Sequence, residues 1–358
     1  METLLEKETF ASAEVNHGLT PERKIDFLRQ MLRIRRFEQA ALKQYQTSGQ
    51  IGGFLHLYSG QEAVAIGTLS LRSEDDQVIA GYRTHGQALA MGMTMNECMA
   101  ELFGKATGCS KGKGGSMHLF APDKNYWGGH GVVAGHTPLG LGLAFALKYK
   151  GIKGCCLCYL GDGAVNQGVY QATLNLASLW SLPVIYIIEN NQYSMGTSQE
   201  RSSAYRDCLA ARAEGYNIEW DRFNGEDIYE VRAKTWPAIQ RAREESRPTV
   251  LEVATYRYYG HSVSDANAKK YRSPEEIDNY RKLHDPIQLW QKRLLDEGVM
   301  TEEQAAELDA AAAAEAAESV RFAGESPLPD KTDIFSDVYS EVDRQTPAGQ
   351  TGKFFFND

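Results

Sequence analysis

No apolar run in this 358-residue chain reaches the roughly 18 to 20 residues that a helix needs to cross a bilayer. The first residues lack both the apolar core of a signal peptide and the Arg-rich, acid-poor character of a transit peptide. An excess of positive charge is missing too, because the formal net charge is -9. A general nucleic-acid binder normally carries a basic surface. We therefore expect a cytoplasmic protein that binds neither membranes nor nucleic acid.

Cysteine is scarce, and the six cysteines show no spacing typical of a disulfide framework. Cys155 and Cys158 have the C-x-x-C interval, which is compatible with a redox or metal site. Their surroundings, Cys-Cys-Leu-Cys-Tyr-Leu, favour a buried strand instead. Residues three apart on a strand point to opposite faces of the sheet, so these two sulfurs would not meet. We predict reduced cysteines that pack in the core.

Three common cofactor and metal motifs are also absent. No G-x-G-x-x-G follows a predicted strand, and neither G-x-x-x-x-G-K-[ST] nor H-E-x-x-H occurs. The sequence therefore gives no support to a dinucleotide site, a P-loop or a zinc site of the metalloprotease type.

Continuous apolar strands alternate with helices in the middle of the chain. Strands are predicted at 77–80, 155–160, 184–188 and 250–254, and helices at 139–149, 168–180 and about 238–245. Buried strands in alternation with helices are typical of a parallel sheet that is covered on both faces. We predict an α/β fold with a mostly parallel central sheet, helices on both faces and a helical C-terminal region.

We divide the chain into a flexible N-terminal segment (1–18), one α/β domain with a helical C-terminal part (19–325) and a C-terminal tail (326–358). A helix over 21–45 begins the domain, because Thr20 can cap it and Pro21 suits its first position. We interpret the alanine-rich helix at 302–321 as a solvated packing helix rather than a partner helix. The tail carries three phenylalanines (354–356), which we expect to dock on another subunit because exposed apolar clusters are unusual.

Polar residues follow two successive predicted strands. Gly161-Asp162-Gly163 follows the strand at 155–160, and Asn190-Asn191 follows the next strand. A right-handed crossover makes these strands parallel, so Asp162 and Asn191 should lie close together at the edge where open α/β sheets bind ligands. Aspartate, amide and carbonyl oxygens suit Mg²⁺, whose coordination is usually completed by phosphates and water. Gly-Asp-Gly alone is most often a plain turn.

The basic, glycine-rich loop at 111–116 is a second candidate for anion binding. Such loops often cradle phosphate, but one this short is equally often a plain connection.

Beyond these patterns, residues 27–287 resemble a known family. The motifs are HLYSGQEA at 56–63, YRTHG at 82–86, GKGGSMH at 112–118, GDGAVNQG at 161–168, MGTS at 195–198 and YRYYGHSVSD at 256–265. Gly-Asp-Gly followed by Asn-Asn resembles the thiamine diphosphate motif. The whole set resembles the alpha subunit of the decarboxylating component of 2-oxo acid dehydrogenase complexes. This resemblance implies a thiamine diphosphate-binding fold and a site for thiamine diphosphate and Mg²⁺.

The resemblance also implies roles for matching residues. The side chains of Asp162 and Asn191 and the carbonyl oxygen of Tyr193 would coordinate Mg²⁺. Tyr82 and Arg83 would hold the diphosphate, and the forked donors of arginine suit phosphate oxygens.

Backbone groups would contribute further contacts to the cofactor. Gly163 and Ala164 would offer backbone contacts to the diphosphate, and the backbones of Gly131 and Val133 would meet the aminopyrimidine.

Two histidines would complete the site. The catalytic residues at the substrate end would be His56 and His261, of which His261 would also contact the cofactor. The other histidines are interpreted as structural or receive no role, as does one arginine: His17, His85, His118, His130, His136, His284 and Arg257.

The family's reaction is the oxidative decarboxylation of a 2-oxo acid, with transfer of the acyl group to a lipoyl domain of the acyltransferase component. The glutamate that activates the cofactor has no match in this chain, and the family places it on a separate beta subunit. We therefore expect an α2β2 heterotetramer with the cofactor between the alpha and beta chains. A single-chain thiamine-dependent decarboxylase or transketolase-like protein is one alternative, and a non-catalytic scaffold is another.

The motifs are most similar to those of enzymes that act on pyruvate and supply acetyl-CoA synthesis. Ala134-Gly135-His136-Thr137-Pro138 departs from the pattern common in those enzymes, so branched-chain 2-oxo acids and acetoin stay open as substrates. Ser198 and Ser262 resemble positions that kinases modify in mitochondrial relatives, but the sequence favours ordinary loop serines here.

Overall fold

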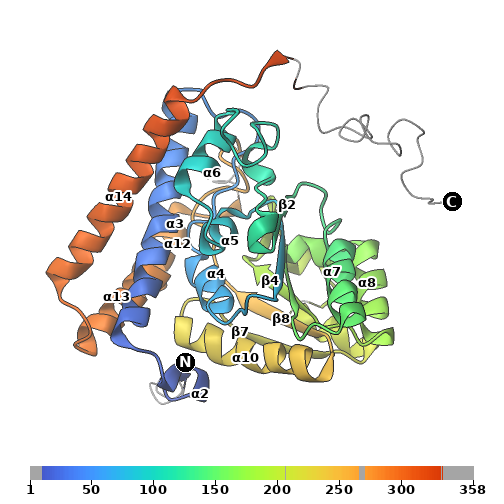
Figure 1. Cartoon of the computed structure of the whole chain (residues 1–358). Coiled ribbons are helices and arrows are strands. Elements are labelled where there is room, and N and C mark those ends of the chain that lie inside the picture. Colours follow the sequence, from blue (N-terminus) through green and yellow to red (C-terminus); the bar gives the residue numbers. More distant parts are fainter. Residues whose placement is uncertain (1–9, 206, 266–270, 332, 334–358) are drawn as a thin grey trace.

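A central sheet of six parallel strands, in the order β2-β1-β3-β4-β8-β7, organises the computed structural model (Figure 1). The structure describes residues 10–205, 207–265, 271–331 and 333. The strands of the sheet are β1 (Gln77–Gly81), β2 (Tyr126–His130), β3 (Cys156–Gly161), β4 (Val184–Asn190), β7 (Glu219–Asn224) and β8 (Thr249–Ala254). A separate antiparallel pair consists of β5 (Tyr193–Ser194) and β6 (Thr197–Ser198). The predicted α/β fold with a mainly parallel sheet is confirmed.

Helices surround this sheet. The α-helices are α2 (Glu14–His17), α3 (Pro21–Thr47), α4 (Glu62–Leu69), α5 (His85–Ala90), α6 (Met95–Leu102), α7 (Thr137–Lys150), α8 (Gly168–Leu179), α9 (Gln199–Ser202), α10 (Ile228–Glu245), α12 (Pro274–Leu283), α13 (Pro286–Asp296) and α14 (Glu302–Glu325). Short 3-10 helices are η1 (Gly115–Met117), η2 (Pro122–Lys124), η3 (Asp162–Asn166) and η4 (Ala210–Tyr216). The long helix predicted from Pro21 is α3, and the Thr20 hydroxyl caps it by accepting a 3.3 Å hydrogen bond from the Arg23 N–H.

Each face of the sheet has its own apolar core. Alternate residues of a strand point to opposite faces, so Cys155 and Leu157 belong to the core that includes residues of α3, α4, α5 and α10. Cys156 and Cys158 belong to the core that includes residues of α7 and α8. All six cysteines lie within the described residues and are free. The prediction that the sulfurs of Cys155 and Cys158 do not meet is therefore confirmed.

The chain changes direction across the sheet between β1 and β3. It leaves β1 for β2 on one side and leaves β3 for β4 on the other side. The connections that leave the carboxyl ends of β1 and β3 therefore run in opposite directions across the sheet. Open α/β sheets bind ligands in the crevice between two such connections. Figure 1 shows α7 and α8 on one side of the sheet and α4, α5 and α10 on the other.

The C-terminal helices pack outside this sheet and its covering helices. Helix α14 runs beside α3 (Figure 1), and small side chains such as Ala312 and Ala316 are buried along it. Arg33 of α3 donates two hydrogen bonds to Glu315 of α14, at 2.6 and 2.8 Å. The alanine-rich helix is therefore a packing helix, as predicted.

Sequence patterns missed two strands of the sheet. Strands β2 and β7 are its edge strands, with the sequences Tyr-Trp-Gly-Gly-His and Glu-Trp-Asp-Arg-Phe-Asn. Glycine, aspartate and glutamate are depleted in strands, so these segments lacked the apolar run that revealed the central strands.

The division of the chain at residues 18 and 325 stays a prediction. In the part of the N-terminal segment that is described, Asn16 of α2 is buried and donates to the Tyr229 carbonyl oxygen of α10 at 2.8 Å. The three phenylalanines at 354–356 lie outside the described residues.

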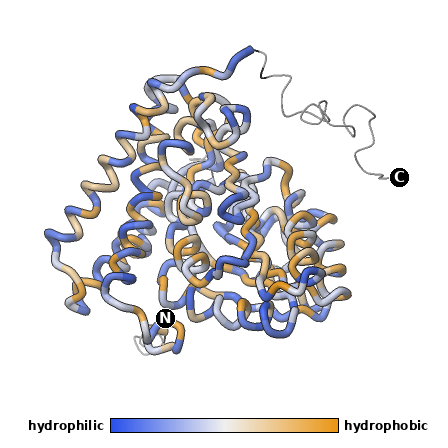
Figure 2. The backbone as a smooth tube through the Cα atoms, viewed as in Figure 1, coloured by the Kyte–Doolittle hydropathy of each residue, from blue (hydrophilic) through white to orange (hydrophobic). Residues whose placement is uncertain are grey.

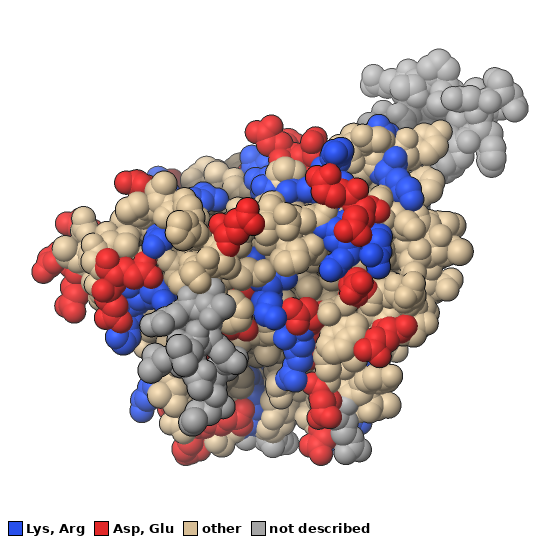
Figure 3. Space-filling model, turned by 90° about the horizontal axis from the view of Figure 1, so that it is seen from below, with Lys and Arg blue, Asp and Glu red and all other residues tan. Residues whose placement is uncertain are grey.

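None of the described helices combines the length and the apolar character needed to cross a membrane. Figure 3 shows basic and acidic side chains interspersed on the face that it presents.

The glycine-rich basic loop at 111–116 binds a carboxylate of the protein itself. Glu101, near the end of α6, is fully buried. Its Oε2 accepts hydrogen bonds from the N–H groups of Ser110 and Gly112 at 2.8 and 2.9 Å. Its Oε1 accepts from Gly114 and Gly115 at 2.7 and 3.1 Å. The backbone N–H groups that could cradle a phosphate therefore already donate to the Glu101 carboxylate.

We predict that Glu101→Gln lowers the free energy of unfolding by about 2 to 4 kcal/mol, because an amide nitrogen would face backbone donors that then lack an acceptor. Urea unfolding measures the change. Glu307→Gln replaces an exposed glutamate of α14 and is the control. Equal stability of the two variants would contradict the role of Glu101.

Candidate functional site at the carboxyl edge of the sheet

A cavity of about 800 Å³ opens at the carboxyl ends of five parallel strands. Its wall includes the turns that follow β2, β1, β3, β4 and β8. Every residue to which the sequence assigned a site role lines it: His56, Tyr82, Arg83, Gly131, Val133, Asp162, Gly163, Ala164, Asn191, Tyr193 and His261. A second cavity of about 910 Å³ lies by β7 and β8 and shares Tyr193 with this set.

The predicted metal ligands line the same cavity. Asp162 is 5% exposed, and its Oδ2 accepts a hydrogen bond from the Ser194 hydroxyl at 3.0 Å. Burial raises the pKa of Asp162, while Ser194 and Arg257 oppose that shift. Among the described residues no group of three or more His, Cys, Asp and Glu side chains could hold a metal. The predicted set instead offers one carboxylate, one amide oxygen and one carbonyl oxygen, which suit Mg²⁺ better than zinc.

Arg257, which received no role from the sequence, contacts two of these oxygens. Its Nη1 donates to Asn191 Oδ1 at 3.0 Å and also to the Tyr193 carbonyl oxygen. The side chain is buried, and burial lowers the pKa of its guanidinium. Each acceptor oxygen has a second lone pair, so it can accept further while Arg257 holds it. Arg257 therefore sets the direction of two of the three predicted ligands.

Gly163 is required by a close approach of two chain segments. A Cβ at this position would lie 2.1 Å from Ser194 Oγ and 2.7 Å from Ser194 Cβ. Glycine therefore leaves the room that the hydroxyl bound to Asp162 occupies.

Arg83 joins two sides of the cavity. Its Nη1 donates to the Leu57 carbonyl oxygen and its Nη2 to the His261 carbonyl oxygen, both at 2.7 Å. Burial, with Arg257 nearby, lowers the pKa of Arg83 to about 10, so the guanidinium stays charged near neutral pH. A guanidinium has more N–H donors than these two bonds use, so donors remain for an anion in the cavity.

His56, His261 and Tyr82 form an aromatic cluster in the cavity wall. The two imidazole centroids are 5.2 Å apart, and the centroid of the Tyr82 ring lies 4.6 Å from that of His56. Burial and the charge of Arg83 lower the pKa of His56 to about 2 and that of His261 to about 3. Both imidazoles are therefore neutral near pH 7.

Besides Arg257, sequence reasoning missed further polar residues of the cavity, among them Glu189 and Gln61. Glu189, in β4, accepts hydrogen bonds from Tyr58 and Gln87, and burial raises its pKa to about 7. Gln61 is buried and accepts a hydrogen bond from Asn191 Nδ2 at 3.2 Å. The position of Glu189 directly before Asn190-Asn191 was the available signal, because the end of a parallel strand faces the ligand edge.

Some residues that were interpreted as structural also lie at the cavity. His130 and His136 line it, and His136 Nε2 lies 2.7 Å from the Tyr159 carbonyl oxygen. Ser262 lines it as well, although this serine is only 5% exposed.

An exposed apolar face adjoins the cavity. Val132 and Val133 line the cavity and are 75% and 41% exposed. Helices α7 and α8 carry many apolar residues, and Figure 2 shows much orange along them. The other large exposed apolar side chains on or beside these helices are Leu139, Phe145, Tyr149, Ile152, Val169, Leu179 and Trp180. Apolar surface of this kind marks an interaction site.

We predict that the imidazoles of His56, which is buried, and His261, which is partly buried, make the protein sensitive to acid. Their folded pKa values lie below the unfolded value of about 6.5, so only the unfolded state takes up protons as the pH falls below 6.5. Their contribution to stability is therefore complete above pH 6.5 and is lost toward pH 3. The loss is about 1 kcal/mol per histidine over the first pH unit.

Urea unfolding between pH 7.5 and 5.5 measures this effect. His56→Gln should lose less stability over this range than the original protein. His17→Gln, which changes an exposed histidine, should keep the original slope. Identical slopes for the two variants would contradict the prediction.

Known proteins are similar to this chain over most of its length. The family model described as "Dehydrogenase E1 component" matches residues 29–332. The chain is 45% identical over 332 residues to the pyruvate dehydrogenase E1 component subunit alpha of Rhizobium meliloti (strain 1021), which covers 93% of this chain and 94% of that protein. It is 45% identical over 320 residues to the protein of the same name in Rickettsia felis, and this alignment covers 89% of this chain and 97% of that protein. A mitochondrial relative of that name in Dictyostelium discoideum is 43% identical over 315 residues, and this alignment covers 88% of this chain and 82% of that protein.

The family match spans most of the chain, and the relatives named as alpha subunits align over most of their length. The chain therefore belongs to the dehydrogenase E1 component family, in agreement with the resemblance seen in its motifs.

Proposed function

We propose that this chain is the alpha subunit of a thiamine diphosphate- and Mg²⁺-dependent enzyme that oxidatively decarboxylates pyruvate. The acetyl group passes to a lipoyl group of the acyltransferase component and so supplies acetyl-CoA synthesis. The observation that carries the proposal is the convergence of all the expected cofactor residues on one cavity at the carboxyl edge of the sheet. The names of the relatives support the choice of reaction.

The donor groups of the cavity fit a magnesium diphosphate. Asp162, Asn191 and Tyr193 offer only oxygen ligands, which Mg²⁺ prefers. Gly163 leaves room for the Ser194 hydroxyl that binds Asp162, since a side chain there would collide with Ser194.

Unpaired polar atoms in the cavity wall also support a bound ligand. Within the described part of the chain, the buried atoms Gln61 Nε2 and His56 Nδ1 have no hydrogen-bond partner. Such atoms are rare in proteins, so they favour a polar ligand in this cavity.

Thiamine diphosphate, when bound, supplies the nucleophilic carbon and the electron sink for loss of carbon dioxide. The residues of this chain hold the group and orient it. Tyr82 and Arg83 would bind the diphosphate, and the backbones of Gly163 and Ala164 would contact it as well. Arg83 remains charged near neutral pH, so it favours the diphosphate over neutral ligands.

His56 and His261 would act at the substrate end of the cavity. Because both imidazoles are neutral near pH 7, each can donate one hydrogen bond and accept another. They can therefore donate or accept a hydrogen bond beside the substrate without adding positive charge next to Arg83. The backbones of Gly131 and Val133 would orient the aminopyrimidine.

The partner in this proposal is a beta subunit in an α2β2 enzyme. The cavity includes one carboxyl group with a pKa near 7, that of Glu189, but Tyr58 and Gln87 already bind its Oε1. A further glutamate from the beta subunit would activate the cofactor. The exposed apolar surface of Val132, Val133 and helices α7 and α8 supports a partner chain at this place, because it adjoins the cavity.

The chain alone should therefore be inactive. We predict that the purified chain, given pyruvate, thiamine diphosphate and Mg²⁺, decarboxylates at least about a hundredfold more slowly than after addition of the beta chain, the usual effect of a missing acid–base group. Assays of the combined chains with pyruvate, branched-chain 2-oxo acids and acetoin, using an artificial electron acceptor, should give the highest kcat/KM with pyruvate.

Each outcome of these assays has a separate meaning. Sustained decarboxylation by the chain alone would contradict the split site and would indicate Glu189 as the activating acid. Preference for a branched-chain 2-oxo acid or for acetoin would contradict the choice of pyruvate. Inactivity of the combined chains toward every substrate would favour a non-catalytic scaffold.

We also predict that Asp162→Ala weakens Mg²⁺-dependent binding of thiamine diphosphate at least about tenfold, because it removes the only carboxylate of the proposed metal set. Calorimetry on the combined chains measures the dissociation constant. Asp123→Ala changes a side chain that is 74% exposed and is the control. Unchanged binding by Asp162→Ala would contradict the metal assignment.

A further inference from the structure

His56 lies on a segment without regular secondary structure. Residues 54–58 belong to neither helix nor strand, and a turn at Ser59 and Gly60 joins them to α4. His56 is nevertheless 4% exposed and lines the cavity. No helix or strand ladder satisfies the backbone of this segment, so other groups must set the position of the imidazole.

Two buried side chains hold the backbone on either side of residue 57. The His56 N–H donates to Ser116 Oγ at 3.3 Å. The Tyr58 N–H donates to Glu38 Oε1 at 2.7 Å. Ser116 and Glu38 come from parts of the chain that are distant from this segment in sequence, so these contacts depend on the fold.

Arg83 holds the middle of the same segment. Its Nη1 donates to the Leu57 carbonyl oxygen at 2.7 Å, and its Nη2 donates to the His261 carbonyl oxygen. Each of the three consecutive residues 56–58 therefore has one backbone group bound by a side chain from elsewhere in the fold.

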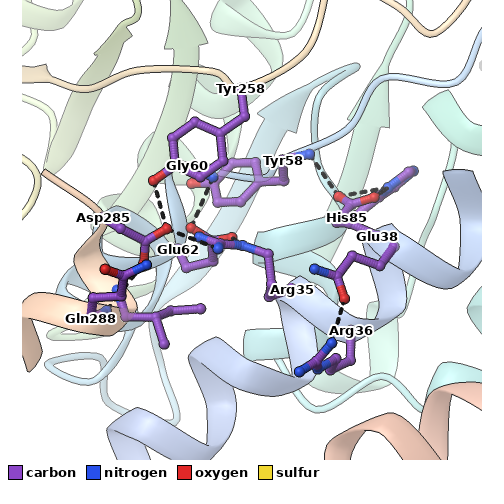
Figure 4. A network of polar contacts seen from close by, with 12 residues as sticks. Arg35, Arg36, Glu38, Tyr58, Gly60, Glu62, His85, Tyr258, Asp285 and Gln288 are labelled. Carbon is purple, nitrogen blue, oxygen red and sulfur yellow. Dashed lines mark hydrogen bonds and ion pairs between the residues drawn. The ribbon is translucent and has the colours of Figure 1, made fainter. Parts of the chain in front are cut away.

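His85 connects two of these anchors. Its Nδ1 lies 3.0 Å from both carboxylate oxygens of Glu38 (Figure 4), and its Nε2 lies 2.9 Å from Ser116 Oγ. His85 and Glu38 have no exposed surface, and the Phe37 ring packs edge-on against the imidazole with centroids 5.7 Å apart. With the proton on Nδ1, the donors run from the His56 N–H through the Ser116 hydroxyl and His85 to Glu38, and every group has a partner.

These three residues have the order of a hydrolase triad, but their setting excludes that chemistry. A serine nucleophile must face the substrate. Ser116 is 5% exposed and does not belong to the cavity wall, and its hydroxyl is bound to His56 and His85. The three residues therefore bind the backbone next to His56, and the Ser116 hydroxyl does not reach a substrate.

We propose that Glu38, His85 and Ser116 form a positioning clamp that sets the His56 imidazole in the cavity. The clamp binds the backbone on both sides of residue 57, and Arg83 binds it in the middle. Because Arg83 also binds the segment that carries the second imidazole, the two imidazoles are held in one arrangement. This inference rests on the proposed function, since it takes from there the role of His56 at the substrate end.

A second buried network secures the end of the same segment. The Gly60 N–H donates to Glu62 Oε2 at 2.9 Å, and Glu62 Oε1 accepts from Arg35 at 2.6 Å (Figure 4). Arg35 also donates to Asp285, which accepts from the Tyr258 hydroxyl as well, at 2.9 and 2.8 Å. The segment is therefore anchored to α3 and α4 and to the start of α13, so loss of one clamp bond should act locally.

Ser116→Ala tests the clamp directly. The change removes the acceptor for the His56 N–H and the hydroxyl beside His85 Nε2 without adding volume, and it leaves the Ser116 carbonyl oxygen 3.2 Å from that nitrogen. Hydrogen exchange of peptides that cover residues 54–60, measured by mass spectrometry on the combined alpha and beta chains, should become about tenfold faster, as expected for loss of one or two hydrogen bonds. Exchange in peptides of α14 should not change.

The kinetic effect should separate positioning from binding. We expect kcat with pyruvate to fall about tenfold to a hundredfold through displacement of His56, with KM and the cofactor dissociation constant changed less than about threefold. Ser319→Ala is the matched control, because Ser319 is a fully buried serine of α14 that donates to the Ala316 carbonyl oxygen at 2.7 Å. It should leave both exchange at 54–60 and kcat unchanged.

A conservative change at Glu38 provides the second test. Glu38→Gln keeps an oxygen that can accept from the Tyr58 N–H, whereas Glu38→Ala keeps none. Glu38→Gln should therefore recover most of the protection of residues 54–60 and of kcat that Glu38→Ala loses. Equal losses in the two variants would contradict the clamp, and so would a Ser116→Ala enzyme with the original exchange and kcat.

Failure of the proposed function would look different. In that case the original combined chains would not decarboxylate pyruvate, while the exchange data would still report on the clamp. If the original enzyme is active and the Ser116→Ala variant is unaffected, the clamp hypothesis is wrong, and the proposed function still stands.

Discussion

The parallel register of the central strands is the constraint on which the site depends. Gly161 of β3 pairs with Glu189 of β4, and the last residues of β4 and β8 pair with each other in the same way. The strands therefore end at nearly the same level, and the turns after them meet at one edge. Asp162, Asn191 and Arg257 are separated in the chain, and this register brings them to one cavity. The buried backbone ladder of the sheet thus determines the geometry of the site.

Buried carboxylates accept hydrogen bonds from backbone N–H groups in irregular segments, as backbone carbonyl oxygens do within the sheet. Glu101 accepts three backbone N–H groups of the glycine-rich loop and that of Ser110 just before it, and Glu38 accepts one from the segment that carries His56. Near the start of β3, Asp76 accepts the Cys155 N–H in the same manner. A buried N–H without an acceptor is costly, so each carboxylate stabilises a segment whose backbone groups have no partner in a helix or strand. Glu38 therefore helps to fix the backbone of the segment that carries the site residue His56.

The sequence was informative where structure follows from neighbouring residues. Apolar runs revealed the central strands, and the spacing of Gly161-Asp162-Gly163 and Asn190-Asn191 located the ligand edge. Edge strands β2 and β7 were missed because their glycine and charged residues give no apolar run. His85 and Arg257 received no role, since their partners come from distant parts of the chain and only the fold brings them together. Local chemistry can be read from sequence, whereas buried polar networks require the tertiary contacts.

The charge of the cavity argues for a divided site. Arg83 and Arg257 are positive, both imidazoles are neutral near pH 7, and the buried carboxyl of Asp162 interacts with both arginines. Asp265 also lines the cavity, but its Oδ2 already accepts hydrogen bonds from the His261 N–H and the Tyr271 hydroxyl. The two guanidiniums are therefore the charged groups available to an anion, and both a diphosphate and a 2-oxo acid are anionic. An additional free carboxylate in the same wall would oppose that attraction, and the carboxyl of Glu189 is held by two hydrogen bonds instead. A glutamate that activates the cofactor is better supplied by a second chain, for which the exposed apolar face beside the cavity offers a surface. The electrostatics of this chain therefore agree with the proposed half-site, in which the activating glutamate would come from the beta subunit.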